Sequence, residues 1–163
     1  MLKKALTTTL ILTLLTLAGC SSVPSNLTEA EQQVYQIQNE TAKKVDQINN
    51  FFASNNINYE RAIQSLNDLK QLAENGLRKL ENLKDDPKVQ ENVSETIRTL
   101  QSTERLTAKI EELSTKANTL VGEGKDTAQN EIDQLNKQID GYVKRLESAQ
   151  EKLDRLSKAL ADN

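Results

Sequence analysis

Residues 128–161, AQNEIDQLNKQIDGYVKRLESAQEKLDRLSKALA, carry the pattern that decides the fold of this chain. Apolar side chains recur along the stretch at alternating spacings of 4 and 3, which is the repeat of a heptad seam on one face of a helix. We therefore predict a long amphipathic helix over about 126–161. Its seam consists of Ala128, Ile132, Leu135, Ile139, Tyr142, Leu146, Ala149, Leu153, Leu156 and Leu160.

Three more helices are predicted upstream, over about 28–53, 58–85 and 87–121. Thr28 and Glu31 have the spacing of a capping box at the start of the first helix. The asparagine-rich stretch 53–58 separates the first helix from the second, because asparagine favours caps and turns over helix interiors. Asp86 and Pro87 suit the N-cap and the first helical position of the third helix, which the glycines of residues 122–124 end.

Each upstream helix carries one apolar stripe. The first stripe is interrupted at 41–44 and the third is weak at 102–104. Gly76 keeps phase with the second stripe, so we expect a continuous helix in which closer helix approach offsets the ~1 kcal/mol propensity cost of glycine. The stripes contain Ala30, Val34, Ile37, Val45, Ile48 and Phe52 in the first helix, Ala62, Leu66, Leu69, Ala73, Gly76, Leu80 and Leu83 in the second, and Val89, Val93, Ile97, Leu100, Leu106, Ile110, Leu113, Ala117 and Leu120 in the third.

These stripes predict an all-α protein of long amphipathic helices. Short connections between long helices favour antiparallel neighbours, and hence an up-down helical bundle or an antiparallel coiled coil over residues 28–163. The residues that flank the last seam are not complementary charges that would specify a parallel homodimer. The narrow stripes leave an elongated oligomeric coiled coil open as the alternative.

The N-terminus has the layout of a bacterial lipoprotein signal. Lys3 and Lys4 precede an uncharged apolar run, Ala5 to Ala18, that is shorter than the ~20 residues of a spanning helix. The run ends in Leu17-Ala18-Gly19-Cys20, which resembles the lipobox of bacterial lipoproteins and contains the only cysteine of the chain. The resemblance implies a signal peptide over 1–19, diacylglycerol on the Cys20 thiol and an acyl chain such as palmitate on the new terminus. The alternative is an ordinary secretory signal in which Cys20 is incidental.

Lipidation of Cys20 predicts a cell-envelope location, with residues 20–27 as a tether between the bilayer and the body. Ser21 after the cysteine is typical of outer-membrane sorting, so we expect the outer membrane facing the periplasm in a Gram-negative source and the outer face of the plasma membrane otherwise. Cys20-Ser21-Ser22, Ile132–Leu135 and Leu153–Leu156 also resemble parts of the murein lipoprotein type. Because this chain ends Ala161-Asp162-Asn163 without the terminal lysine of that type, covalent attachment to peptidoglycan is not expected.

The composition argues against catalysis. The chain has no histidine and its one cysteine is assigned to lipid, so Cys/His metal sites and Ser-His-Asp triads are excluded. Residues 122–125 lack the spacing of a phosphate-binding loop. With a formal net charge of −3 and no basic cluster, a nucleic-acid partner is not expected. We predict no enzyme activity, no cofactor and no metal.

Two functions remain from different classes. The first is a non-catalytic spacer or scaffold, held on the lipid bilayer through acylated Cys20. The second is an adaptor subunit of an envelope assembly, with a protein partner or self-association through the helices. Four apolar residues near the first connection, Phe51, Phe52, Ile57 and Tyr59, either plug the end of the bundle or form a partner contact at the distal tip.

Overall fold

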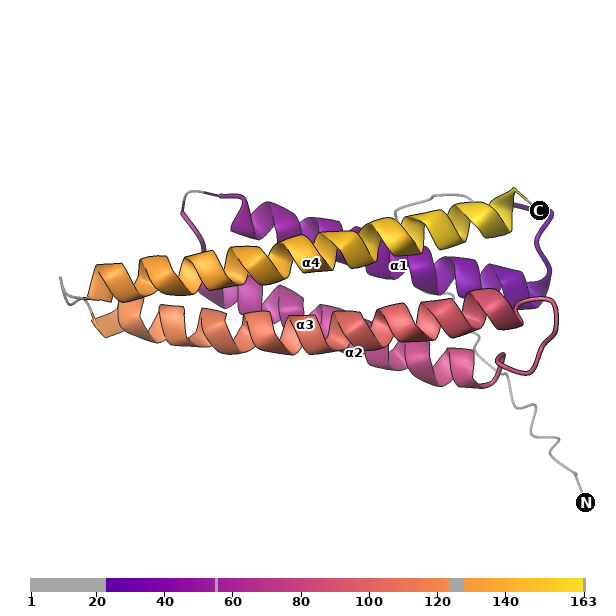
Figure 1. The fold of residues 1–163 in the computed structure, drawn as a ribbon, viewed down its shortest axis with the longest axis horizontal. Helices are drawn as coiled ribbons and strands as arrows, with labels where there is room; N and C mark the ends of the chain where they lie inside the picture. The colour runs from indigo at the N-terminus through magenta and orange to yellow at the C-terminus, as the bar shows by residue number, and fades with distance from the viewer. Residues whose placement is uncertain (1–22, 55, 124–127, 163) are drawn as a thin grey trace, which may run out of the picture.

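The protein is an elongated four-helix bundle (Figure 1). The computed structural model describes residues 23–54, 56–123 and 128–162. Its helices are α1 (Glu29–Phe52), α2 (Tyr59–Glu81), α3 (Gln90–Glu123) and α4 (Gln129–Ala161). Consecutive helices run in opposite directions, and α1 and α3 each pack against both α2 and α4. This arrangement confirms the predicted all-α class and its up-down topology.

The two ends of the bundle differ. One end, here the proximal end, contains the start of α1, the α2–α3 connection and the end of α4 (Figure 1). The other, the distal end, contains the α1–α2 connection. The helices α3 and α4 have 34 and 33 residues, against 24 in α1 and 23 in α2. Their surplus length projects beyond the α1–α2 connection, and at ~1.5 Å per residue the rod is about 50 Å long.

The first two helices begin at side-chain caps. Thr28 and Glu31 form the expected capping box: the Thr28 amide donates to Glu31 Oε2 at 2.7 Å and the Glu31 amide donates to Thr28 Oγ1 at 3.4 Å. The hydrogen bonds from Thr28 lower the pKa of the Glu31 carboxyl. Asn58 caps α2 by accepting the Arg61 amide at 3.1 Å.

The prediction for the start of α3 was wrong. Asp86 Oδ1 accepts the Lys88 amide at 2.9 Å, and the Asp86 carbonyl accepts the Val89 amide at 3.1 Å. These bonds close a turn around Pro87, and the regular helix begins only at Gln90. Asp86 therefore caps a turn rather than the helix. For α4, whose start was predicted at about residue 126, residues 124–127 lie outside the described residues, and Ala128 occupies the N-cap without a side-chain hydrogen bond.

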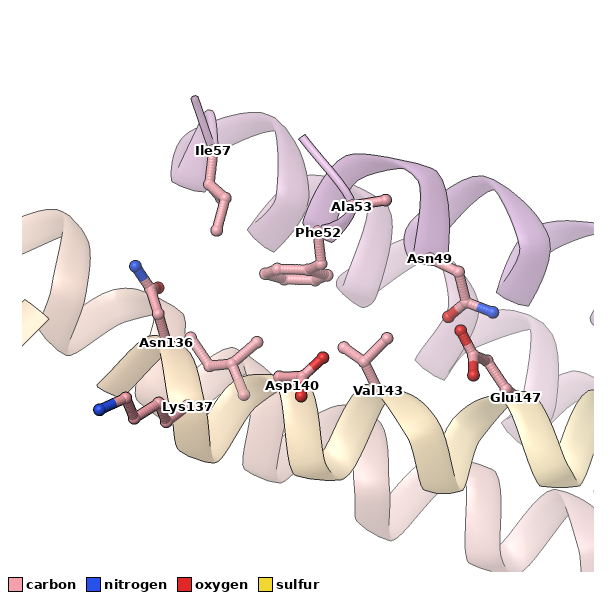
Figure 2. Close-up of a pocket in the computed structure, with 10 residues that line it drawn as sticks. Asn49, Phe52, Ala53, Ile57, Asn136, Lys137, Asp140, Val143 and Glu147 are labelled. Carbon is pink, nitrogen blue, oxygen red and sulfur yellow. The ribbon is translucent and has the colours of Figure 1, made fainter. Parts of the chain in front are cut away.

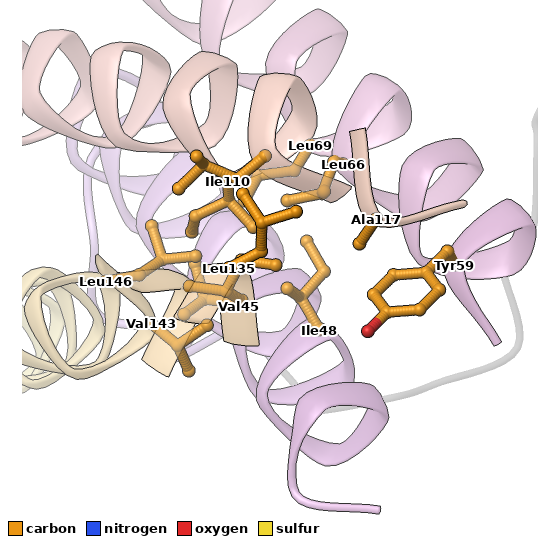
Figure 3. Packing of buried hydrophobic residues seen from close by; sticks show 12 residues of the cluster. Val45, Ile48, Tyr59, Leu66, Leu69, Ile110, Ala117, Leu135, Val143 and Leu146 are labelled. Atoms are coloured by element: carbon orange, nitrogen blue, oxygen red, sulfur yellow. The ribbon is translucent and has the colours of Figure 1, made fainter. Parts of the chain in front are cut away.

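The apolar interior consists of two clusters (Figure 3 shows the first). Both draw on all four helices, which is why no pair of helices accounts for the core. The distal core contains Val45, Ile48, Tyr59, Leu66, Leu69, Ile110, Leu113, Ala117, Leu135, Ile139, Val143 and Leu146. The proximal core contains Val34, Ile37, Ala73, Leu80, Val89, Val93, Leu100 and Leu160.

Threonines fill the two weak points of the predicted stripes. Thr41 and Thr103 are fully buried, and each hydroxyl donates to the carbonyl four residues back, Ile37 at 2.7 Å and Thr99 at 3.0 Å. Such a bond satisfies the hydroxyl within its own helix, so the side chain can stand in an interior position. Both weak points of the stripes thus contribute a side chain to the core.

A buried glutamine ties three helices together in the proximal half. Gln38 of α1 is fully buried, and its Nε2 donates to Asn92 Oδ1 at 2.5 Å and to Thr96 Oγ1 at 2.7 Å on α3. Asn92 Nδ2 then donates to the Leu156 carbonyl of α4 at 3.1 Å. Buried polar contacts of this kind restrict which helix positions can face one another.

The inward face of α4 departs from the predicted seam at two positions. Val143 and Ser157 are buried, whereas Tyr142 and Leu156 are only partly buried. Because α4 packs against both α1 and α3, its buried face is wider than the seam of a two-stranded coil. Gly76 behaves as predicted: α2 continues through it, and a Cβ there would lie 2.9 Å from Ile37 Cγ2 and 3.0 Å from Leu100 Cδ1.

Candidate functional site

The predicted lipidation site precedes the described residues. Cys20 and the signal over 1–19 lie outside them, so lipidation remains a prediction. The described part of the chain begins at residue 23. Residues 23–28 lead into α1, which begins at the proximal end of the bundle (Figure 1).

The four residues predicted at the α1–α2 connection do not form one surface patch. Tyr59 is buried at 6% exposure, and its hydroxyl donates to Asn136 Oδ1 on α4 at 2.6 Å. Burial raises the pKa of this phenol. Phe52 and Ile57 are partly buried against the distal core. Phe51 lines a separate depression together with Gln47, Asn50 and Ser65.

A groove of about 380 Å³ lies between the end of α1 and α4 (Figure 2). We call it the α1–α4 groove. Phe52 enters it from α1, and Val143 faces it from α4. Its apolar lining is Phe52, Ala53, Ile57, Ile139 and Val143, and Asp140 and Glu147 stand on its α4 side. Sequence reasoning singled out Phe52 and Ile57 but missed the α4 wall, because the heptad pattern placed Tyr142 rather than Val143 on the inward face.

Carboxylates form a row along the α4 side of this groove. Asp133, Asp140, Glu147 and Asp154 recur every seven residues, so they share one face of α4. Burial and the neighbouring carboxylate of Asp46 on α1 raise the pKa of Asp154. Lys144, which lies on the same helix, forms an ion pair with Asp140 at 2.7 Å.

Asn49 supplies a polar group at the inner end of the groove. Its Nδ2 donates to Gln150 Oε1 at 3.3 Å, whereas its Oδ1 is buried and accepts no hydrogen bond from the residues that the structure describes. In Figure 2 the Asn49 and Glu147 side chains face each other across the groove. The site thus combines an apolar floor with a hydrogen-bond acceptor and carboxylates.

The other shifted carboxyl groups belong to ion pairs on the surface. Hydrogen bonds from Lys109 and Lys116 lower the pKa of Glu112 to about 2. A hydrogen bond from Lys152 of α4 likewise lowers the pKa of Glu95 on α3. Across residues 23–54, 56–123 and 128–162, no three His, Cys, Asp or Glu side chains are grouped so that they could hold a metal ion.

Within the described residues, no helix has both the length and the apolar character needed to cross a bilayer. Comparison of the chain with protein-family models, with curated proteins and with solved structures found no match.

Proposed function

We propose that this chain is a non-catalytic, lipid-anchored protein of the bacterial cell envelope that acts as a spacer or scaffold. The observation that carries the proposal is the direction of the rod: the start of α1 and the α3–α4 hairpin lie at opposite ends. α1 begins at the proximal end, a few residues after Cys20, while the α3–α4 hairpin projects at the opposite end. A lipid on Cys20 would therefore hold the proximal end near the bilayer and present the distal end to about 50 Å from it.

The physical chemistry of acyl anchors is consistent with this role. Each buried CH₂ contributes ~0.8 kcal/mol, so a single chain anchors weakly and two or three chains anchor stably. A lipobox cysteine carries two chains on its sulfur and, in many bacteria, a third on its amino group. This anchor can retain a body whose surface is polar, and 28% of this chain is charged residues.

The arrangement of the core supports a stiff spacer. The distal and proximal cores follow each other along the rod, and the Gln38–Asn92 and Tyr59–Asn136 bonds fasten different helix pairs in the two halves. Lys152 of α4 also pairs with Glu95 of α3 at 2.5 Å. Contacts at several heights oppose sliding and bending of one helix against another, as a spacer requires.

The test is membrane retention of a Cys20→Ser variant of the full chain. We expect the parent protein in the membrane fraction and the variant in the soluble extracytoplasmic fraction or as unprocessed precursor. Ser22→Ala is the matched control, because it alters the same segment without removing the thiol, and it should fractionate like the parent. Parent-like processing and membrane recovery of Cys20→Ser would refute the anchor.

The α1–α4 groove favours one second candidate, an adaptor subunit that docks a partner near the distal end. Here the structure separates the two phenylalanines: Phe52 lines the groove and packs on the distal core, whereas Phe51 lies outside it. Substituting each by Ser therefore distinguishes the roles. Loss of partner recovery with Phe52→Ser at a temperature where its helical CD signal is intact supports the adaptor, and a pure spacer predicts no change in recovery.

A further inference from the structure

The α1–α4 groove marks the place where α1 stops and α4 continues. α1 ends at Phe52, whereas α4 extends toward the distal end as far as Gln129 (Figure 1). The α4 surface beyond Phe52 has no partner helix on the line of α1 among the described residues, and Ile132 there is only partly buried. A short helix placed there would continue the line of α1 along α4 and cover the apolar lining of the groove.

Carboxylates follow the α1 side of α4 past the groove. The row Asp133, Asp140, Glu147 and Asp154 follows the α1 side of α4, and α1 faces Asp154 with another acid, Asp46. Lys137 also lines the groove, and Lys144 is engaged with Asp140. Among the described residues Glu147 makes no ion pair, so a cation for this groove carboxylate can come from a partner.

The inner end of the groove contains a buried hydrogen-bond acceptor to which no described residue donates. Asn49 Oδ1 is buried without a hydrogen bond from the described residues, and Glu147 faces it (Figure 2). A buried acceptor that lacks a donor is unfavourable. An ammonium or guanidinium group at this point would satisfy the amide oxygen and pair with the carboxylate at once.

We propose that the α1–α4 groove binds a basic amphipathic helix of a partner protein. The apolar side of that helix would lie on Phe52, Ile57 and Val143, and its Lys or Arg side chains would face Asp140, Glu147 and Asn49. The lining, the free acceptor and the acidic row each require one property of the occupant: an apolar face, a donor and positive charge. This proposal rests on the second candidate function, the adaptor, and names the class of partner that the adaptor would dock. Binding of such a helix does not depend on the lipid on Cys20.

The probe is a synthetic amphipathic helix of leucine and lysine with one tryptophan. Because the chain contains no tryptophan, the emission of the mixture reports the peptide alone. Residues 21–163 are suitable for this titration, since every described helix contact and both cores lie within them. We expect saturable binding that weakens as salt is added, and no binding of the same peptide with glutamate in place of lysine.

Variants then locate the binding. Asp140→Asn with Glu147→Gln should weaken binding by about fivefold, the loss expected of two exposed charge contacts. Ala53→Arg, which places bulk and positive charge in the groove, should abolish it. Glu111→Gln with Glu112→Gln removes the same charge from α3 and should bind like the parent. Amide chemical-shift changes should centre on residues 49–57 and 132–147.

Three outcomes would overturn the proposal. The first is equal binding by the groove variants and the α3 control, which would mean attraction to overall charge. The second is chemical-shift changes elsewhere on the bundle. The third is a dimer in analytical ultracentrifugation that the Asp140/Glu147 double variant dissociates, which would make a second copy the occupant. In each case membrane retention through Cys20 would be unaffected, so the lipid anchor and the groove are tested separately.

Discussion

The Tyr59 hydroxyl donates a hydrogen bond to Asn136 Oδ1 at 2.6 Å and so joins the first turn of α2 to α4 at the distal end. The two helices are otherwise diagonal in the bundle, each packing against α1 and α3. The Tyr59 ring is also part of the distal core, beside Ala117 of α3 (Figure 3). One side chain therefore closes the end of the core and fastens a diagonal pair of helices.

Tyr59→Phe should lower the free energy of unfolding by about 1 kcal/mol, because it removes one buried hydrogen bond and keeps the ring. For a chain of this size the melting temperature should fall by about 3 °C. Tyr35→Phe is the matched control, since the Tyr35 hydroxyl makes no hydrogen bond among the described residues and its ring packs on the proximal core. Equal losses in the two variants, measured by urea unfolding, would contradict the role of the Tyr59–Asn136 bond.

Two glycines should respond to alanine in opposite directions. Gly76→Ala places a Cβ against the buried Ile37 and Leu100 side chains, and this crowding should outweigh the gain in helix propensity by about 1–2 kcal/mol. Gly141 is exposed in α4, and a Cβ added there would meet nothing within 4 Å, so Gly141→Ala should stabilise by about 0.5–1 kcal/mol. Thermal unfolding followed by CD measures both. A stabilised Gly76→Ala would contradict the close packing of α2 against Ile37 and Leu100.

Gln38 offers a test of the buried polar contacts. Its Nε2 donates to Asn92 Oδ1 and Thr96 Oγ1, and Thr96 also donates to the Asn92 carbonyl at 2.7 Å. Gln38→Leu keeps most of the volume and leaves no buried donor unpaired, so stability should change by less than about 1 kcal/mol. Gln38→Ala also opens a cavity and should cost about 2–4 kcal/mol. Equal losses in urea unfolding would show that the hydrogen bonds, not the packing, dominate at this position.

The acidic row predicts a pH effect at Asp154. Burial and Asp46 raise the pKa of Asp154 in the folded chain above its unfolded value. Its favourable contribution is therefore fully present below the unfolded pKa and is lost as the pH rises through the folded pKa. Asp154→Asn should be more stable than the parent at neutral pH, and the difference should disappear below about pH 4. Melting temperatures across that range, with Asp162→Asn as the control, would contradict this if the difference were independent of pH.

Periodicity predicted the helices and their topology because four long amphipathic stripes with short connections have few ways to bury their apolar faces. It could not predict Thr41, Thr96, Thr99 and Thr103 as interior residues. Their polarity is cancelled by bonds to carbonyls of the same helix, and a count of apolar residues does not register such a bond. The buried role of Gln38 depends likewise on Asn92, a residue 54 positions away.

The candidate site was predictable only in part. Phe52 and Ile57 stood out as apolar residues beside a break, but Phe51 and Tyr59 take different directions that adjacency in the sequence does not reveal. The α4 wall depends on Val143, whose inward position arises because α4 packs against two helices at once. The orphan Oδ1 of Asn49 depends on its three-dimensional neighbours and has no signature in the sequence.

Acyl chains on one sulfur are proposed to hold this rod at a membrane, and every statement about its orientation follows from them. The most direct test is intact-mass and peptide mass spectrometry of the mature protein extracted from the membrane fraction of its native cells. We predict a chain that begins at Cys20 and carries a diacylglycerol thioether on that residue. A mature chain that retains residues 1–19, or that begins elsewhere and carries an unmodified Cys20, would contradict the account.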